Sequence, residues 1–224
     1  EVGRVLAELE ADGLAENTIV VYFSDHGAGM PRSKRWLYDS SLRVPMIARF
    51  PERWKSLAPG APGSTWDSLV TFVDFGPTML SLAGVPIPAH MQGRPFLGAA
   101  AAPARDYVHG FRDRMDERTD LLRTVRDRKW RYIRNFRPDL TWAQHIGYMY
   151  EMPTMKVWQR LHDEGKLDPV QDRFFSATKP VEELYDTETD PWEIRNLAGD
   201  PAQRATLERL RGELRRWMLE IRDL

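Results

Sequence analysis

The feature that most constrains the fold is a continuous run of apolar and β-branched residues at positions 18–23. Such a run is typical of a strand buried on both faces in the centre of a parallel sheet. Residues 2–9 carry apolar side chains at helical spacing before it, and Gly13 stands where that helix would end. A helix followed by a buried strand predicts an α/β fold with a mostly parallel sheet.

The next part of the chain predicts two more elements of this layer. Residues 44–50 form a second apolar run, entered through Pro45, and are expected to be a strand. Residues 74–83 are expected to form a helix, with Asp74 as its N-cap and Gly84 at its end.

An Ala- and Pro-rich segment at residues 99–104 separates these elements from a different pattern. We therefore expect one domain at residues 1–98 and a second at residues 99–224. In the second, residues 107–111, 121–126 and 130–135 have the composition of strands, and the last two are close enough for an antiparallel hairpin. A stripe of apolar residues at helical spacing predicts a final helix packed on this small sheet: Leu207, Leu210, Leu214, Trp217, Met218 and Ile221.

Charge and cysteine content narrow the possible functions. Lysine and arginine total 32 against 33 aspartate and glutamate, so the net charge of -1 gives no electrostatic case for binding nucleic acid or an anionic membrane. The absence of cysteine excludes disulfides, thiolate metal sites and cysteine nucleophiles within these residues. No apolar run approaches the length of a membrane span. We expect a globular chain in which any anion-binding role is local.

Polar residues follow the first predicted strand directly. Asp25 and His26 come after it, and in open parallel sheets ligands bind beyond the carboxyl ends of the strands. A carboxylate and an imidazole there, followed by Gly27, can bind one metal ion or one anion. An alternative from the residues alone is an aspartate that caps the next turn beside a half-exposed histidine.

The loop that follows adds three cations within reach of the same strand end: Arg32, Lys34 and Arg35. An oxyanion needs such donors, both to hold it and to stabilise charge that develops on a leaving oxygen. The alternative is a solvated basic loop with no ligand.

These residues resemble the C-terminal half of the sulfatase family signature, in the alkaline-phosphatase superfamily. The resemblance is carried by residues 19–27, the loop with Lys34, residues 37–47, 73–80 and 91–96, and residues 183–186 with Asp190, Pro191, Glu193, Asn196 and Leu197. The pattern is similar to arylsulfatases and, in its Met-Pro-Arg loop, to the sulfamidase-like branch. It spans nearly the whole chain, and it implies a sulfatase-type α/β sheet followed by a small antiparallel sheet.

The resemblance also implies roles for the strand-end residues. Asp25 and His26 would be ligands of a calcium ion, and Lys34 would contact the sulfate as a catalytic cation. The family usually has Asn where His26 stands, and calcium prefers oxygen, so the identity of the ion stays open. His26 has a second possible role in catalysis, as a contact to the sulfate or the leaving group.

A mixed segment after the first strand of the second domain is the other expected site. By the same resemblance it faces the substrate, so Arg112, Arg114 and Asp116 are expected to bind the sugar or its amine. The alternative is a salt-bridged surface turn.

The family nucleophile is a formylglycine made in a Cys/Ser-x-Pro-x-Arg motif. The nearest match, residues 101–105, has Ala at the nucleophile position and is dismissed as chance. The chain also opens at Glu1, inside a helical pattern. We therefore expect the C-terminal portion of a longer enzyme, with the formylglycine in the missing N-terminal part. This portion alone is expected to be inactive, and its exposed apolar strand surface is expected to make it aggregate.

The expected function is hydrolysis of sulfate esters or sulfamates of sulfated sugars, by a periplasmic or secreted enzyme. One alternative is a phosphoester or phosphonate hydrolase of the same superfamily. Such enzymes typically hold two zinc ions with more histidine ligands than the five scattered histidines here offer. The other alternative is a degenerate, non-catalytic domain that binds glycans.

Overall fold

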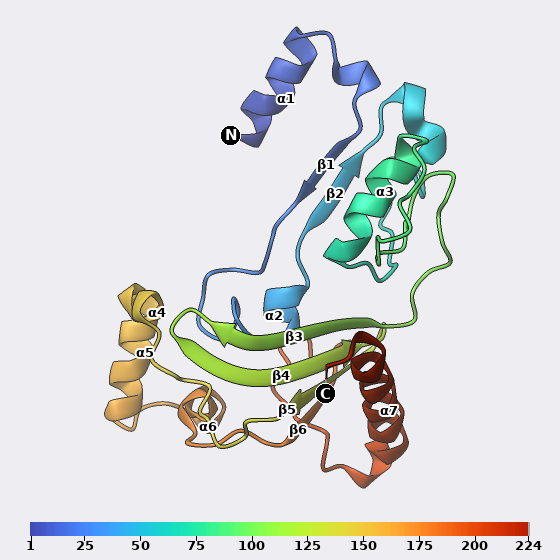
Figure 1. Cartoon of the computed structure of the whole chain (residues 1–224). Coiled ribbons are helices and arrows are strands. Elements are labelled where there is room, and N and C mark those ends of the chain that lie inside the picture. Colours follow the sequence, from blue (N-terminus) through green and yellow to red (C-terminus); the bar gives the residue numbers. More distant parts are fainter. Residues whose placement is uncertain (224) are drawn as a thin grey trace. The chain divides into compact units, whose positions relative to one another are not determined.

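The structure is a computed structural model that describes residues 1–223, and it divides into two compact units (Figure 1). The first unit comprises Glu1–Ser24 and Pro45–Asp106. The second comprises Asp25–Val44 and the described residues from Tyr107 onward. The chain therefore enters the second unit directly after the first strand and leaves it before the second strand. The expected domain boundary at residue 98 stays a prediction.

The first unit contains the predicted helices and strands. Its elements are α1 (Val2–Ala11), η1 (Ala15–Asn17), β1 (Val20–Phe23), β2 (Met46–Arg49), η2 (Glu52–Leu57), η3 (Phe72–Asp74) and α3 (Phe75–Leu82). Helix α1 ends just before Gly13, whose φ of +69° is the left-handed conformation expected after a helix. The mixed α/β character of the chain is confirmed.

The parallel sheet expected around residues 18–23 is wrong for the strands described. Strand β1 pairs with β2 in the antiparallel direction, with Val20 opposite Arg49 and Phe23 opposite Met46. Every strand pair within residues 1–223 is antiparallel. A parallel pair is usually joined by a crossover helix, whereas the helix described between β1 and β2 is α2 (Asp39–Leu42), which has only 4 residues.

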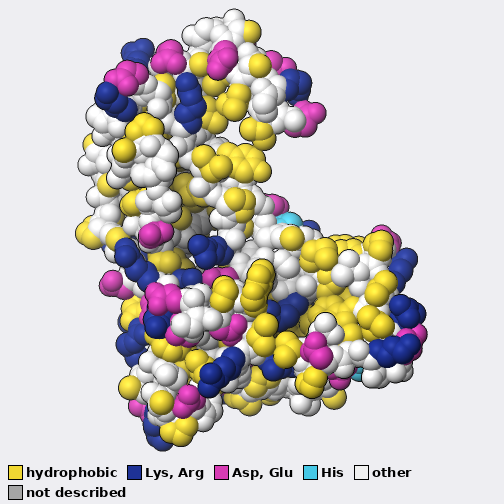
Figure 2. Space-filling model, turned by 180° about the vertical axis from the view of Figure 1, so that it is seen from behind, with side chains coloured by type: hydrophobic (Ala, Val, Ile, Leu, Met, Phe, Trp, Pro, Cys, Tyr) yellow, Lys and Arg dark blue, Asp and Glu magenta, His cyan; other side chains and the backbone are white. Residues whose placement is uncertain are grey.

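Burial of β1 on both faces is also not observed. Tyr22 is 47% exposed and Phe23 is 43% exposed, because within residues 1–223 the sheet has only two strands. Hydrophobic side chains, yellow in Figure 2, reach the surface in both units. The aggregation expected from this surface stays a prediction.

Asp74 precedes α3 as predicted, but its side chain makes no cap bond to that helix. The carboxylate is buried and accepts hydrogen bonds from Arg105 Nε at 2.9 Å and from the backbone N–H of Arg94 at 2.7 Å. It also accepts from the backbone N–H of Thr71 at 3.2 Å. Asp74 therefore ties the segments after α3 back to the start of this helix.

The second unit is a four-stranded antiparallel sheet with short helices and one long helix (Figure 1). Besides α2 it contains β3 (Val108–Met115), β4 (Arg118–Arg126), β5 (Trp130–Asn135), α4 (Gly147–Glu151), α5 (Pro153–Asp163), α6 (Pro169–Asp172), η4 (Arg173–Phe175), β6 (Glu182–Asp186), η5 (Pro201–Gln203) and α7 (Arg204–Ile221). The sheet order is β3-β4-β5-β6. The predicted hairpin and final helix are confirmed, whereas β6 was recognised only as a motif.

Two apolar clusters hold this unit together. Leu207, Leu210 and Leu214 of α7 pack with apolar residues of β4, β5 and β6, as the helical stripe predicted. The other cluster includes Trp36, Leu37 and Tyr38, which are at most 3% exposed. The segment between β1 and β2, where the sequence predicts a loop with three cations, therefore supplies part of the core.

Candidate functional site

Asp25 and His26 begin the second unit and lie side by side. His26 Nε2 is 3.5 Å from Asp25 Oδ2, and His26 Nδ1 is 2.6 Å from the carbonyl oxygen of Gly27. The Asp25 side chain is 83% exposed, so its carboxylate is accessible to a ligand.

The loop that follows is closed by its own hydrogen bonds. The N–H of Gly27 donates to Ser41 O at 2.8 Å, and the N–H of Lys34 donates to Ala28 O at 3.1 Å. A Cβ at Gly27 would lie 1.9 Å from Ser40 O, so only glycine allows this approach of the two ends. The second bond holds the backbone of Lys34 against Ala28, two residues beyond His26.

Asp25 and His26, the predicted calcium ligands, differ in how well they suit this ion. Calcium takes six to eight oxygen ligands, and the exposed Asp25 carboxylate fits as one of them. The His26 imidazole is a nitrogen donor and fits this ion less well. Within residues 1–223 no group of three or more His, Asp or Glu side chains is arranged to hold a metal. Asp25 and His26 can therefore supply only part of a coordination sphere.

Lys34 lies in a cluster of cations and aromatic rings. Its Nζ is 5.4 Å from the centroid of the Tyr148 ring, and the guanidinium carbon of Arg35 is 3.8 Å from the same centroid. Arg35 Nε donates to Asp116 Oδ2 at 3.1 Å. The structure thus brings Lys34 and Asp116, two of the predicted site residues, to the same cluster.

Arg112 belongs to this cluster but is buried. Its side chain is 1% exposed, and its guanidinium carbon lies 3.9 Å from the centroid of the Trp36 ring. Burial lowers the pKa of Arg112 to about 10, and the nearby charge of Arg35 lowers it too, while Asp120 opposes the shift. Arg112 therefore stays charged at neutral pH, and because its side chain is buried it does not lie in a salt-bridged surface turn.

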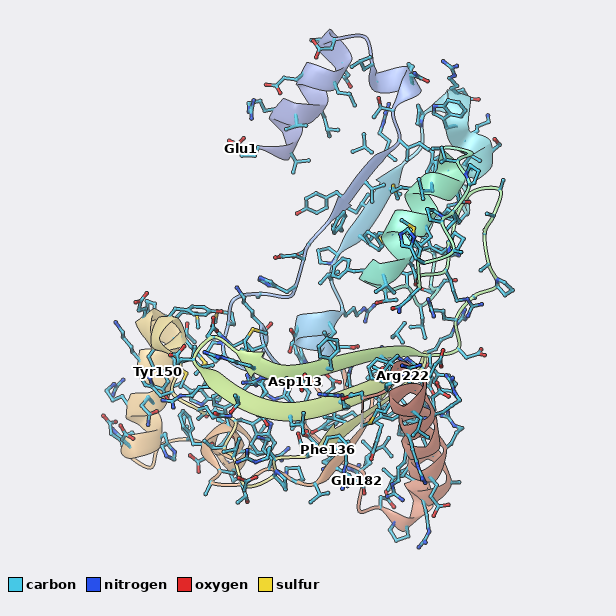
Figure 3. All side chains as sticks on the ribbon, viewed as in Figure 1. Glu1, Asp113, Phe136, Tyr150, Glu182 and Arg222 are labelled. Atoms are coloured by element: carbon cyan, nitrogen blue, oxygen red, sulfur yellow. The ribbon has the colours of Figure 1, made fainter. Side chains whose placement is uncertain are left out.

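Arg114 differs from its two predicted neighbours. It is exposed, and its Nε donates to the backbone carbonyl of Asp116 at 3.1 Å, across the β3–β4 turn. Helix α4, on which Figure 3 labels Tyr150, lies beside this turn, where the N–H of Gly147 donates to Glu117 Oε1 at 2.6 Å. The substrate-binding roles of Arg112, Arg114 and Asp116 stay predictions.

A buried network of ion pairs, which the sequence did not indicate, joins four residues: Asp39, Arg126, Arg131 and Glu193. Arg126 binds both oxygens of Asp39 at 3.0 Å, and Arg131 contacts both Asp39 and Glu193. Burial alone would raise the pKa of Asp39, but the charges of Arg131 and Arg126 bring it below its ordinary value. For Glu193, burial dominates and raises the pKa.

Arg32 attaches the loop to the segment that contains Glu193. The two terminal nitrogens of Arg32 donate to Trp192 O at 3.0 Å and to Glu193 O at 2.6 Å. Its guanidinium carbon lies 3.9 Å from the centroid of the Tyr38 ring. Of the three loop cations, Arg32 therefore has a structural role, and Lys34 and Arg35 face the cluster around Tyr148.

Comparison with known proteins identifies the family. The family model described as Sulfatase matches residues 1–85. An ulvan-active sulfatase from Formosa agariphila is 45% identical over 224 residues, which are 100% of this chain and 36% of the relative. The human N-sulphoglucosamine sulphohydrolase is 28% identical over 240 residues, covering 99% of this chain and 45% of the relative.

A solved structure of a sulfatase is also similar to this chain. A 2-O GAG sulfatase superposes with a TM-score of 0.70 at 26% identity, covering 99% of this chain and 40% of the other. These matches define an α/β fold of the alkaline-phosphatase superfamily. Within that superfamily, the chain belongs to the sulfatase family.

The chain spans 36% and 45% of the lengths of these two curated relatives. None of the helices in residues 1–223 combines the length and apolar character that crossing a membrane requires.

Proposed function

We propose that the protein carrying this chain hydrolyses sulfate esters or sulfamates of sulfated sugars. The sulfatase family membership supports the reaction type. The observation that carries the proposal is the position of Lys34, whose backbone is bonded to Ala28 just beyond the Asp25–His26 pair. The backbone of Lys34 is thus fixed close in sequence to an exposed carboxylate, and an ammonium together with a carboxylate-bound metal ion is suited to holding an oxyanion.

Each strand-end residue has a proposed role. The Lys34 ammonium contacts the sulfate and offsets charge on its oxygens as the sulfur–oxygen or sulfur–nitrogen bond breaks. Asp25 is one carboxylate ligand of a divalent cation, calcium by family resemblance, which when bound withdraws charge from the sulfate. His26 is either a second ligand or a contact to the leaving group. No residue of this chain matches the formylglycine motif, so the nucleophile is assigned to another part of the protein.

The sugar is proposed to contact the β3–β4 hairpin. Arg112 and Asp116 belong to the cluster that contains Lys34, and Arg114 is exposed beside them. The relatives are named for activity on ulvan and on N-sulphoglucosamine, which supports a sulfated sugar as substrate. A periplasmic or secreted location is proposed on the same family grounds.

The test is turnover by the protein that carries this chain, on a panel of O-sulfated and N-sulfated monosaccharides and a matched phosphate ester. Lys34→Ala is expected to lower kcat/KM by about 100-fold or more, as loss of one oxyanion donor does. Its unfolding free energy should change by less than about 0.5 kcal/mol. Arg128→Met, at an exposed position in the β4–β5 turn, is the matched control for loss of a cation.

Three results would contradict the proposal. Unchanged turnover in the Lys34 variant would remove this residue from the mechanism. Faster turnover of the phosphate ester would favour the phosphoester hydrolase reading. Glycan binding without any turnover would favour a non-catalytic domain.

A further inference from the structure

The cluster around Lys34 contains buried donors that lack acceptors. Within residues 1–223, Arg35 Nη1 and Nη2, all three guanidinium nitrogens of Arg112, and Trp36 Nε1 have no hydrogen-bond partner. The side chains of Arg35 and Arg112 are each 1% exposed. Buried polar side chains nearly always have partners, so this group of orphaned donors requires an explanation.

Structural stabilisation does not explain the cluster. A buried guanidinium is unfavourable unless it is paired and hydrogen-bonded. Stacking on Trp36 and Tyr148 offsets part of that penalty, but it uses the faces of the guanidinium groups and leaves their N–H groups unsatisfied. Arg35 also has a φ of +88°, a conformation disfavoured for any residue with a side chain. Strained backbone that persists in a folded protein is often found at functional sites.

The charge balance of the cluster favours an anion. Asp116 bonds to Arg35 Nε at 3.1 Å. Asp120 is already occupied by Lys179 Nζ, at 2.9 and 3.0 Å, and lies 4.0 Å from Arg112 Nη1. With Lys34, the group holds four cations and two carboxylates, and the charge of the buried Glu183 also acts on Lys179, which leaves an excess of one positive charge.

We propose that Arg35 and Arg112 bind a second acidic group of the substrate, a carboxylate or sulfate on the same glycan as the sulfate that is hydrolysed. The inference rests on the proposed function for the identity of the molecule that carries this group. The orphaned N–H groups can donate in pairs to a planar carboxylate or to two oxygens of a sulfate. The specificity of the site is therefore for glycans with at least two anionic groups.

The Tyr148 ring covers the guanidinium group of Arg35. The orphaned nitrogens are enclosed by protein atoms, and the Tyr148 ring lies 3.8 Å from the guanidinium carbon of Arg35. Tyr148 is itself 37% exposed, on the short helix α4. The acidic group therefore reaches Arg35 when the Tyr148 side chain turns aside.

Inorganic sulfate is the first probe, titrated by calorimetry into the protein that carries this chain, at ionic strength held constant with chloride. The wild type is expected to show two sulfate sites, one lost in Lys34→Ala and the other in Arg112→Met or Arg35→Met. Acetate should compete at the second site. Arg128→Met should retain both sites.

The thermal midpoint separates a ligand role from a structural one. Without sulfate, Arg112→Met should melt at the same temperature as the wild type or higher, because an apolar side chain of similar size replaces a buried unpaired charge. With sulfate, the wild type should gain stability that the variant does not. A large fall in the melting temperature of Arg112→Met without sulfate, or sulfate binding unaffected by both arginine variants, would overturn the proposal.

Kinetics then identify the acidic group. Three substrates share one scissile sulfate: a monosulfated sugar, the same sugar with a carboxylate, and the same sugar with a second sulfate. Arg112→Met is expected to lower kcat/KM at least tenfold more for one of the two substrates with a second acidic group than for the monosulfated sugar. The substrate with the larger loss shows whether Arg112 binds a carboxylate or a sulfate. Equal losses on all three would overturn this inference. If Lys34→Ala leaves turnover intact while the arginine variants still lose the second site, the mechanism proposed for Lys34 fails and this inference survives.

Discussion

Arg35 and Asp116 join the loop after β1 to the β3–β4 turn through a bond of 3.1 Å between Nε and Oδ2. The Arg35 side chain is 1% exposed and the Asp116 side chain is 35% exposed, so the pair connects the interior of the second unit to its surface. Both residues have positive φ, +88° at Arg35 and +55° at Asp116. Two segments distant in sequence are therefore fixed together in the cluster that contains Lys34 and Arg112.

This pair predicts a stability loss in Asp116→Asn. Asparagine tolerates the positive φ and keeps an oxygen acceptor, so the change removes only the charge opposite the buried Arg35. We expect a loss of about 1–2 kcal/mol in unfolding free energy, measured by urea denaturation. In an Arg35→Met background the same change should have almost no effect, and an equal loss in both backgrounds would show that the pair does not contribute.

Gly27 and Gly29 offer a matched comparison within one loop. Gly27→Ala would place a Cβ 1.9 Å from Ser40 O, whereas nothing lies within 4 Å of a Cβ at Gly29. We expect Gly27→Ala to destabilise the protein by more than about 2 kcal/mol, since backbone must move. Gly29→Ala should be neutral or slightly stabilising, because it restricts the unfolded chain. Thermal unfolding of the two variants checks this, and similar melting temperatures would contradict the close approach at Gly27.

The strong local patterns in the sequence were sufficient to predict many elements. The helix before Gly13, the strand at Trp130–Asn135 and the apolar stripe of α7 all appear in the structure, since local spacing determines which face each one buries. The direction of β1 relative to β2 was not predictable in this way, because a buried apolar run looks the same in either pairing.

The candidate site was predictable only in part. Sequence indicated Lys34 and Arg112, but not that Arg112 is buried on Trp36 or that Arg35 bonds to Asp116. Such partners are far apart in the chain, and no local pattern encodes them. The missed burial of Trp36 has the same cause, since a segment with many cations suggests solvent when its packing partners are unknown.

Asp120 and Lys179 form an ion pair with both side chains fully buried, at 2.9 Å. Burial lowers the pKa of Lys179, and the bonded Asp120 opposes that shift. Asp120→Ala should destabilise the protein by about 3–5 kcal/mol, because it leaves the buried ammonium without its carboxylate. Replacing both residues with apolar ones, as in Asp120→Leu with Lys179→Met, should be milder than the single change. Denaturant unfolding of the three proteins checks the order, and a double variant less stable than Asp120→Ala would contradict it.

The shifted pKa values of Asp39 and Glu193 predict opposite pH dependences of the unfolding free energy. The pKa of Asp39 is below its ordinary value in the folded protein, because the charges of Arg131 and Arg126 outweigh its burial. Its ionised form therefore stabilises the fold above the unfolded pKa of about 4, and this contribution is lost as pH falls through the lower folded pKa. Burial raises the pKa of Glu193, so protonation of Glu193 relieves a penalty as pH falls toward its unfolded value.

The variants Asp39→Asn and Glu193→Gln separate the contributions of these two carboxyl groups to the unfolding free energy. Asp39→Asn should flatten the fall in unfolding free energy below about pH 4, while lowering stability at pH 7 because two buried arginines lose their carboxylate. Glu193→Gln should remove a gain in unfolding free energy that the wild type shows as pH falls from the raised folded pKa of Glu193 to its unfolded pKa of about 4.3, and should leave the fall below pH 4 unchanged. Urea unfolding between pH 7 and pH 3 measures both slopes. Identical slopes in the wild type and Asp39→Asn would show that Asp39 titrates in the folded protein as it does in the unfolded chain, and that the arginines do not hold its charge.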